Sequence, residues 1–148
     1  IGGARTFTAF MRSIGDDKTR LDRREPELNE ATPGDARDTT TPIAAARSLQ
    51  TLLLDGVLSA PARNELTQWM LGDQVADALL RAGLPRDWQI ADKSGAGGHG
   101  SRSIIAVVWP PKRSAVIVAI YITQTAASMS ASNQAVSRIG SALAKALQ

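Results

Sequence analysis

Two continuous apolar stretches, residues 104–109 and 115–122, constrain the fold of this chain more than any other feature. Both are rich in valine and isoleucine, a composition typical of strands that are buried on both faces. The connection between them is too short for the crossover helix that a parallel pair requires, so we expect antiparallel pairing. Trp88 and Ile90 alternate with polar neighbours and predict another strand ahead of these two. The sequence therefore predicts an antiparallel hairpin or meander of three strands.

Helical patterns occupy most of the chain before these strands. Apolar residues at helical spacing in residues 6–15 predict an amphipathic helix that Gly15 ends. Thr41, an N-cap residue followed by proline, predicts a second helix that reaches about residue 54. Ser59 starts a third helix in the same way, and its expected buried side carries Leu66, Trp69 and Met70. The first half of the chain is therefore predicted to be helical.

Two further helices are expected around the strands. A short helical piece is predicted near residues 75–82, and a long helix from about residue 129 onward. The buried face of the long helix is expected to cover the sheet and to carry Val136, Ile139, Leu143 and Leu147. A three-stranded sheet with one covering helix leaves its other face and at least one long edge without a partner. We therefore expect the complete protein to contain more strands and helices.

Composition narrows the possible classes of function. The chain has 148 residues, of which 43% are hydrophobic and 21% charged, as is typical of one soluble globular domain. The net charge is +3, but basic residues are interleaved with acids, and only 4% of residues are aromatic, too few for a base-stacking surface. We therefore expect no nucleic-acid partner. No stretch approaches the roughly 20 apolar residues of a membrane span, so we expect no membrane partner either.

The supply of cysteine and histidine limits the chemistry further. The chain has no cysteine, which excludes disulfides and thiolate metal sites within it. His99 is its only histidine, so it can assemble neither a histidine-dependent triad nor a histidine pair for zinc. We expect no metal and no cofactor. The chain starts without an initiator methionine or the features of a secretion signal, and we expect it to be a mature, processed or excised piece.

Residues 16–38 form a charged stretch without sustained periodicity, and loops of this length are usually functional or disordered. Within this stretch Glu25 and Asn29 are four residues apart, and Pro26 could start a turn of helix between them. Such a turn would place the carboxylate and the amide on the same side, where they could hold one water between them and a general base could act. The same spacing also fits a solvated loop whose acids merely balance its arginines.

A second chemical pattern follows the strand expected at residues 88–92. It consists of Lys93 and Ser94, then the small residues Gly95, Ala96 and Gly97, with Arg102 further on. Lysine, serine and arginine near one strand can bind a carboxylate, and small residues let a ligand approach exposed backbone amides. The tract equally fits a glycine-rich turn with incidental charges. It is not a phosphate-binding loop, because the lysine precedes the glycines.

Taken in order, three motifs resemble those of the class A serine β-lactamases. They are Arg-Leu-Asp-Arg-x-Glu-Pro-Glu-Leu-Asn from residue 20, Pro-Gly-Asp-Ala-Arg-Asp-Thr-Thr from residue 33 and Asp-Lys-Ser-Gly-Ala-Gly from residue 92. The similarity extends from Ile1 to about residue 147. It implies an α/β (α+β) fold of the β-lactamase/transpeptidase type, in which helices flank an antiparallel sheet beside an all-helical subdomain. Residues 1–72, with an Ω-type loop at 20–38, would belong to the helical domain, and residues 73–148 to the C-terminal part of the α/β domain.

The resemblance implies catalytic roles for several of these residues. Glu25 would activate the water that deacylates the enzyme, and Asn29 would help to hold that water. The peptide bond between Glu25 and Pro26 would be cis. The backbone amide of Ala96 would form half of an oxyanion hole. Lys93, on the same strand as Ala96, would also be a catalytic residue.

The resemblance also implies how a substrate would be held. Lys93, Ser94 and Arg102 would receive its carboxylate. Gly95 and Gly97 would keep the edge of the strand open to a β-lactam. Ser94 stands where many relatives have threonine, which preserves the hydroxyl group.

Other residues would support the site. Arg23 and Asp38 would form the salt bridge that closes the loop, and Asn133 would lie beside Arg102. Two positions depart from close relatives. Arg24 replaces an aromatic residue, and Ser132 stands where an arginine is common. Both could alter the packing of the loop or the response to inhibitors.

Two motifs of the family, the Ser-x-x-Lys nucleophile box and the Ser-Asp-Asn box, belong upstream of Ile1 and are absent from this chain. The resemblance implies hydrolysis of β-lactam antibiotics through a serine acyl-enzyme, and hence antibiotic resistance. Penicillins are the expected substrates, with cephalosporins left open. The N-terminal portion of the same enzyme would supply the nucleophile, so we expect this chain alone to be inactive. The implied location is the periplasm or the exterior of a bacterium.

Two other functions remain open at this point. A penicillin-binding transpeptidase shares the Lys-Ser-Gly strand but generally lacks the loop that carries Glu25 and Asn29. A non-hydrolytic β-lactam-sensing domain would bind the drug and stay acylated. The loop favours the hydrolase over the transpeptidase.

Overall fold

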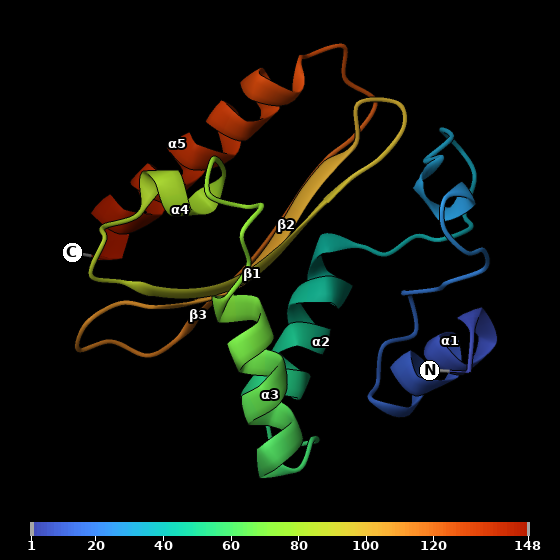
Figure 1. Cartoon of the computed structure of the whole chain (residues 1–148), viewed down its shortest axis with the longest axis horizontal. Helices are drawn as coiled ribbons and strands as arrows, with labels where there is room; N and C mark the ends of the chain where they lie inside the picture. The colour runs from blue at the N-terminus through green and yellow to red at the C-terminus, as the bar shows by residue number, and fades with distance from the viewer. Residues whose placement is uncertain (1, 148) are drawn as a thin grey trace.

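The structure is a computed structural model that describes residues 2–147 (Figure 1). Its helices are α1 (Ala4–Ser13), α2 (Pro42–Leu53), α3 (Ala60–Leu71), α4 (Leu80–Gly83) and α5 (Met129–Leu147), and its strands are β1 (Gln89–Ala96), β2 (Arg102–Trp109) and β3 (Val116–Ile122). One turn of 3-10 helix, η1 (Glu27–Asn29), lies in the long loop between α1 and α2. The chain is therefore helical first, then stranded, and ends in a long helix, as predicted.

The starts of α2 and α3 follow from their capping residues. The hydroxyl of Thr41 accepts a hydrogen bond from the backbone N–H of Ala44 at 3.2 Å, and Ser59 does the same for Ala62 at 3.4 Å. In each helix a proline occupies the first turn, where its missing N–H costs nothing. Both predicted helix starts are confirmed.

The three strands form one antiparallel sheet in the order β1-β2-β3. Gln89 of β1 pairs with Trp109 of β2, and Ala96 pairs with Arg102 across the short turn at the other end. The prediction of an antiparallel meander is confirmed. This register places Ala96, the last residue of β1, opposite Arg102, the first residue of β2. Both residues therefore lie at the same end of the sheet.

One face of the sheet packs against α4 and α5. Ile104 on this face is fully buried together with Leu80 of α4 and Val136 of α5. The two helices cross closely because glycines lie at the contact. A Cβ atom on Gly83 would lie 1.9 Å from the carbonyl oxygen of a residue in α5, and one on Gly140 would lie 2.6 Å from that of Leu80.

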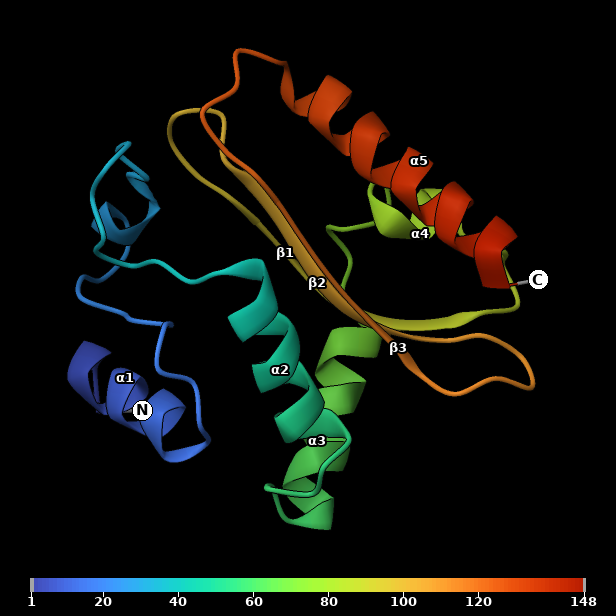
Figure 2. The same ribbon diagram turned by 180° about the vertical axis from the view of Figure 1, so that it is seen from behind.

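The opposite face of the sheet is covered in part by α2 and α3, whereas the sequence predicted a face without a partner (Figure 2). Leu49 and Leu53 of α2 and Met70 of α3 pack there with Ala91 and Val107 of the strands. The expectation of a bare face was wrong because periodicity does not reveal which element a helix packs against. The division at residues 72 and 73 stays a prediction.

Two predicted core residues are exposed. Trp69 of α3 is 67% exposed and Ile139 of α5 is 46% exposed. In α3, Met70 turns toward the sheet, and its neighbour Trp69 therefore turns away from it. In α5 the buried stripe runs through Val136, Gly140 and the later Ala144, one turn apart, so Ile139 falls outside it.

The helical piece predicted at residues 75–82 is shorter in the structure, because only α4, at Leu80–Gly83, is helical. Ahead of α4, the carboxylate of Asp73 accepts a hydrogen bond from the backbone N–H of Val75 at 3.2 Å. Such a local side-chain bond competes with helix formation and favours a turn. The prediction placed the start of this helix too early.

The first helix and the long loop lie on the side of α2 away from α5, as both ribbon views show (Figures 1 and 2). No extensive packing contact joins α1 to another helix or strand among the described residues. Contacts other than the packing of α1 must therefore hold the loop in place.

None of the helices among residues 2–147 combines the length and the apolar character needed to cross a membrane.

Candidate active site

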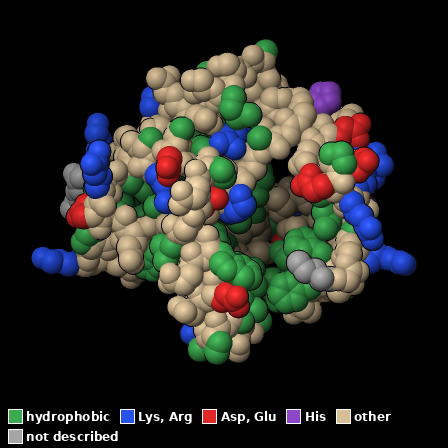
Figure 3. Space-filling model, viewed as in Figure 1, with side chains coloured by type: hydrophobic (Ala, Val, Ile, Leu, Met, Phe, Trp, Pro, Cys, Tyr) green, Lys and Arg blue, Asp and Glu red, His purple; other side chains and the backbone are tan. Residues whose placement is uncertain are grey.

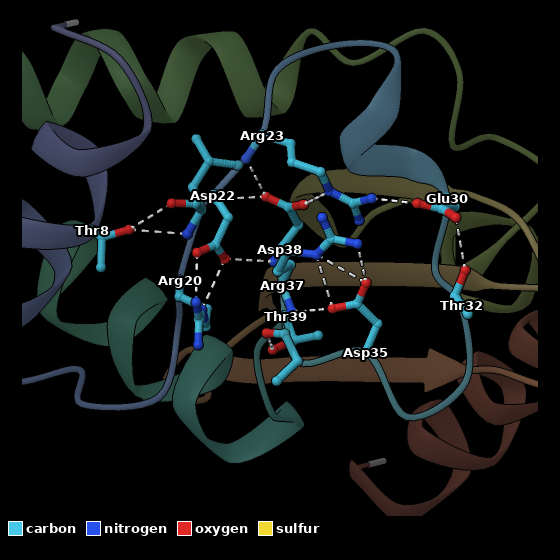
Figure 4. A network of polar contacts seen from close by, with 12 residues as sticks. Thr8, Arg20, Asp22, Arg23, Glu30, Thr32, Asp35, Arg37, Asp38 and Thr39 are labelled. Carbon is cyan, nitrogen blue, oxygen red and sulfur yellow. Dashed lines mark hydrogen bonds and ion pairs between the residues drawn. The ribbon is translucent and has the colours of Figure 1, made fainter.

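The ends of the loop are fastened by Asp38 (Figure 4). One of its carboxylate oxygens accepts the backbone N–H groups of Asp22 at 2.6 Å and Arg23 at 2.9 Å, and the other accepts Nε of Arg23 at 2.5 Å. The side chain of Asp38 is only 3% exposed. Burial raises the pKa of this carboxyl group, but the hydrogen bonds outweigh burial and leave the pKa below its ordinary value. The expected pair of Arg23 and Asp38 is thus present.

Other charges of the loop also pair with one another. Arg23 donates a second hydrogen bond to Glu30, and the pairs Arg20–Asp22 and Arg37–Asp35 have N–O distances of 2.5 and 2.6 Å. This much agrees with the simple alternative, a loop whose acids balance its arginines. That alternative does not account for Glu25, which has no ion-pair partner among the described residues.

Glu25 contacts an amide instead of an arginine. The side-chain nitrogen of Asn29, the last residue of η1, donates a hydrogen bond to Oε2 of Glu25, which lies two residues before η1 begins. The Glu25–Pro26 peptide bond is cis, as the resemblance implied. The carboxylate and amide are therefore side by side, as their spacing predicted. They touch directly, whereas the sequence predicted that a water would lie between them.

The loop reaches the end of β1 through two glycines. The backbone N–H of Gly98 donates to the carbonyl oxygen of Asn29 at 2.8 Å. A Cβ atom on Gly98 would lie 2.2 Å from the carbonyl oxygen of Glu30, and one on Gly97 would lie 2.8 Å from that of Asn29. Side chains are therefore excluded where the loop meets the strand. This contact places the loop beside β1.

The family resemblance assigned Gly97 a different purpose, and no sequence pattern singled out Gly98. The run of glycines in residues 97–100 indicated a flexible turn, whereas the structure uses Gly97 and Gly98 for a close approach between two segments. The need for glycine at position 98 comes from its contact with Glu30, which lies 68 positions earlier in the chain (98 minus 30). No local pattern could have revealed it.

Arg102 contacts both Asn133 and the backbone of β1. Arg102 is the first residue of β2, and its Nε donates to Oδ1 of Asn133 on α5 at 2.9 Å. Its Nη1 donates to the carbonyl oxygen of Gly95 at 3.1 Å. The residue is 9% exposed, and burial lowers the pKa of its guanidinium. Asn133 thus fixes the plane of a nearly buried cation beside Gly95.

The remaining predicted residues lie on β1 itself. Lys93, Ser94 and Ala96 belong to this strand, which is an edge of the sheet because only β2 pairs with it among the described residues. The Nζ atom of Lys93 lies 3.6 Å from Oδ1 of Asp73, a residue that sequence reasoning did not consider. No hydrogen bond or ion pair joins Glu25 to Lys93 or Arg102 within the described residues. The two groups of candidates meet through backbone at Gly98.

Metal chemistry has no evident site. No group of three or more histidine, cysteine, aspartate or glutamate side chains in the described part of the chain is placed to hold a metal ion. The site therefore offers a carboxylate beside an amide, a strand edge, and two cations. These groups can activate a water, present backbone amides and bind an anion.

A carboxylate–amide pair on a loop beside an edge strand that carries lysine and serine is the arrangement that the resemblance to the class A serine β-lactamases implied. Residues 1–147 match the family model described as the β-lactamase enzyme family, and the chain belongs to this family. The resemblance to class A β-lactamases, and the fold that it implied, are confirmed.

Known relatives agree with this assignment. Over 140 residues, 95% of this chain, it is 69% identical to β-lactamase AER-1 of Aeromonas hydrophila and 52% identical to β-lactamase CARB-4 of Pseudomonas aeruginosa. These matches cover 46% and 49% of the two relatives, so the chain spans about half the length of the curated relatives it matches.

Solved structures of class A β-lactamases share the fold of this chain. The ancestral GNCA class A β-lactamase has a TM-score of 0.96 and 50% identity, and the match covers 98% of this chain and 56% of that one. The chromosome-encoded β-lactamase of Vibrio parahaemolyticus has a TM-score of 0.96 and 47% identity, with 100% and 56% covered.

Proposed function

We propose that this chain is the C-terminal part of a class A serine β-lactamase and supplies the water-activating and carboxylate-binding residues of its active site. The observation that carries the proposal is the contact between Glu25 and Asn29, on a loop that is bonded to the end of β1. A solvated loop whose acids only balance its arginines does not require this carboxylate–amide contact.

The proposed role of Glu25 is that of a general base. In the acyl-enzyme, a water attacks the ester carbonyl carbon while Glu25 takes one of its protons. The bond from that carbon to the serine oxygen then breaks, and the proton returns to that oxygen, which restores the serine hydroxyl and the Glu25 carboxylate. Asn29 contacts the carboxylate and would help to orient the water. The serine itself lies outside this chain and would come from the N-terminal portion of the same enzyme.

The proposed role of β1 and Arg102 is to hold the β-lactam. The strand edge leaves backbone amides unpaired, and the amide of Ala96 would serve as half of the oxyanion hole. Lys93, Ser94 and Arg102 would bind the substrate carboxylate. Arg102 is suited to this because its guanidinium is nearly buried, so its charge is weakly screened.

We propose that the N-terminal portion also completes the core. Figure 3 shows a hollow between α2 and the loop, with hydrophobic side chains at its margins. Several large apolar side chains from different elements are exposed: Phe10 of α1, Ile43 of α2, Trp69 of α3 and Tyr121 of β3. A contiguous exposed apolar patch usually marks a surface that another segment covers, and the hollow with its hydrophobic margins is the candidate for such a surface. The relatives are bacterial β-lactamases, which supports a periplasmic or secreted location.

Hydrolysis of nitrocefin tests the proposal against its alternatives. We expect the complete protein to turn over many equivalents, whereas a β-lactam-sensing domain would release one equivalent and stop. Residues 1–148 alone should give no turnover, because the nucleophile is absent. Adding the N-terminal half as a second polypeptide should restore activity. Turnover by a verified preparation of this chain alone would contradict the proposal.

A further inference from the structure

A carboxylate that the proposed function does not use lies next to Lys93. Asp73 follows the C-terminal end of α3, and its side chain is 9% exposed. Its Oδ2 accepts the backbone N–H of Val75 at 3.2 Å, and its Oδ1 lies 3.6 Å from Nζ of Lys93. The carboxylate is thus oriented by its own backbone, with one oxygen turned toward the lysine.

The position of Asp73 relative to β1 is fixed by a second ion pair. Arg81 of α4 bonds to the fully buried Asp92 of β1 and also donates to the carbonyl oxygens of Met70 at 3.3 Å and Leu71 at 3.4 Å. Because Asp92 directly precedes Lys93, Arg81 ties the end of α3 to the strand at that point. Asp73, two residues beyond Leu71, is thereby held beside Lys93.

The charges at this place leave Asp73 and Lys93 to balance each other. Arg81 is engaged by Asp92, and its hydrogen bonds to that carboxylate include one at 2.9 Å. A carboxylate as buried as Asp73 needs a compensating charge, because burial without a partner is costly. Lys93 supplies the only ion pair found for Asp73 among the described residues.

We propose that Asp73 is a positioning residue that fixes the ammonium group of Lys93 for the substrate carboxylate. The proposal rests on the proposed function, which gives Lys93 its role. A free lysine side chain has four rotatable bonds and loses conformational freedom when it binds an anion. An aspartate that already restricts it lowers that loss, so Asp73 acts on substrate binding. It does not touch the reacting atoms.

The test compares steady-state kinetics of the complete enzyme and its variants with a penicillin. We expect Asp73→Ala to raise KM about fivefold with kcat within about twofold, as the loss of a partly exposed ion pair allows. Asp73→Asn keeps an oxygen for Val75 and Lys93 and should recover part of that change. Asp77→Ala is the matched control, because it removes the same charge from an exposed neighbour that has no bond to Lys93.

Three results would overturn the proposal. One is a KM for Asp73→Ala equal to that of wild type or of Asp77→Ala. The other is an undiminished effect of Asp73→Ala in a Lys93→Ala background, because a positioning residue cannot act on an absent lysine. A drop in kcat alone would also contradict a role in binding.

Equilibrium unfolding in urea separates this proposal from the proposed function. If wild type does not hydrolyse penicillin, the proposed function fails, and the unfolding cycle of Asp73→Ala, Lys93→Ala and the double variant still tests the pair. Coupling between the two changes supports the contact. Additive losses would contradict it, and the isosteric Asp73→Asn replaces Asp73→Ala in the cycle if that variant does not fold.

Discussion

The loop at residues 16–38 and the strand pair β1–β2 carry the two halves of the candidate site, and different interactions hold them in place. The loop is fixed by side chains, above all by Asp38, which binds Arg23 and two backbone N–H groups. The strands are fixed by a continuous backbone ladder and a buried core. A single side-chain change can therefore release the loop, whereas the strand residues keep their register.

This difference has a consequence for catalysis. The proposed general base, Glu25, belongs to the region whose geometry depends on a few charged groups. The proposed carboxylate-binding residues, Lys93 and Arg102, belong to the region that the ladder holds. Changes in the loop are thus expected to act on the chemical step, and changes at the strand on the affinity for substrate.

The largest effect is expected where the two regions meet. Gly98→Val would place a side chain where a Cβ atom already comes within 2.2 Å of the carbonyl oxygen of Glu30, and the loop must move away. A displacement of about 1 Å at a catalytic group can cost about 100-fold in rate, and we expect a loss of this order in kcat. Stopped-flow measurement of deacylation in the complete enzyme checks it.

The control for that prediction is Gly34→Ala. Gly34 lies in the same loop, has a φ of 85°, and has nothing within 4 Å of a built Cβ atom. The alanine should cost about 1 kcal/mol of stability through its left-handed backbone and leave deacylation nearly unchanged. Equal slowing in the two variants would mean that the contact at Gly98 does not position the loop.

The next effect concerns the fastening of the loop. Asp38→Ala should lower the free energy of unfolding by about 2 kcal/mol, because it removes the charged acceptor of two backbone N–H groups and of the Arg23 guanidinium. Urea denaturation of the complete protein measures it, with the highly exposed Asp17→Ala as a near-neutral control. Combining Asp38→Ala with Arg23→Ala should cost less than the sum of the two single changes. Strict additivity would show that the two residues are not coupled.

A comparable or smaller effect is expected at the strand. Arg102→Ala should reduce kcat/KM for a penicillin by about 1.5 to 3 kcal/mol in transition-state terms, the range for a hydrogen bond to a charged group. The exposed Arg86→Ala removes the same charge just before the start of β1, at the end of the strand opposite Ala96, and should leave kcat/KM within about twofold. An unchanged kcat/KM in Arg102→Ala would exclude the contact with the substrate carboxylate.

The smallest effect is a pH dependence at the base of the loop. Burial raises the pKa of Asp16, but hydrogen bonds from Thr19, from Ser48 and from backbone N–H groups outweigh it and lower the pKa from 3.8 to about 2. A lowered pKa stabilises the folded state above about pH 4, and this contribution disappears as the pH falls toward 2. It amounts to about 2 kcal/mol.

Asp16→Asn should therefore be less stable than wild type at pH 6, and the difference should shrink between pH 4 and pH 2. Urea unfolding at several pH values checks this. If the two stability curves run parallel through that range, the network around Asp16 does not depend on its charge.

The sequence was a good guide where the determining contacts are local. Thr41 and Ser59 marked helix starts through bonds to residues three positions later, and the apolar strands were recognised by their composition. The spacing of Glu25 and Asn29 also predicted a contact within one turn. In each case the interaction spans only a few residues, so a pattern along the chain contains it.

Long-range packing was beyond the reach of such patterns. Trp69 and Ile139 are apolar residues at helical spacing, but the side that each helix buries depends on a partner distant in sequence. The need for glycine at position 98 and the place of Asp73 beside Lys93 arise in the same way. The pairing of Arg23 with Asp38 was expected only through the family resemblance, because the two residues are fifteen positions apart in an irregular loop.

The central claim is that Glu25 serves as the base for deacylation, and mass spectrometry of a Glu25→Gln variant of the complete enzyme tests it most directly. The amide cannot take a proton from the attacking water, so we expect deacylation to slow by orders of magnitude. A covalent adduct with the mass of the penicillin should then persist after mixing, while wild type returns to the free enzyme. Rapid return of the variant to free enzyme would contradict the claim.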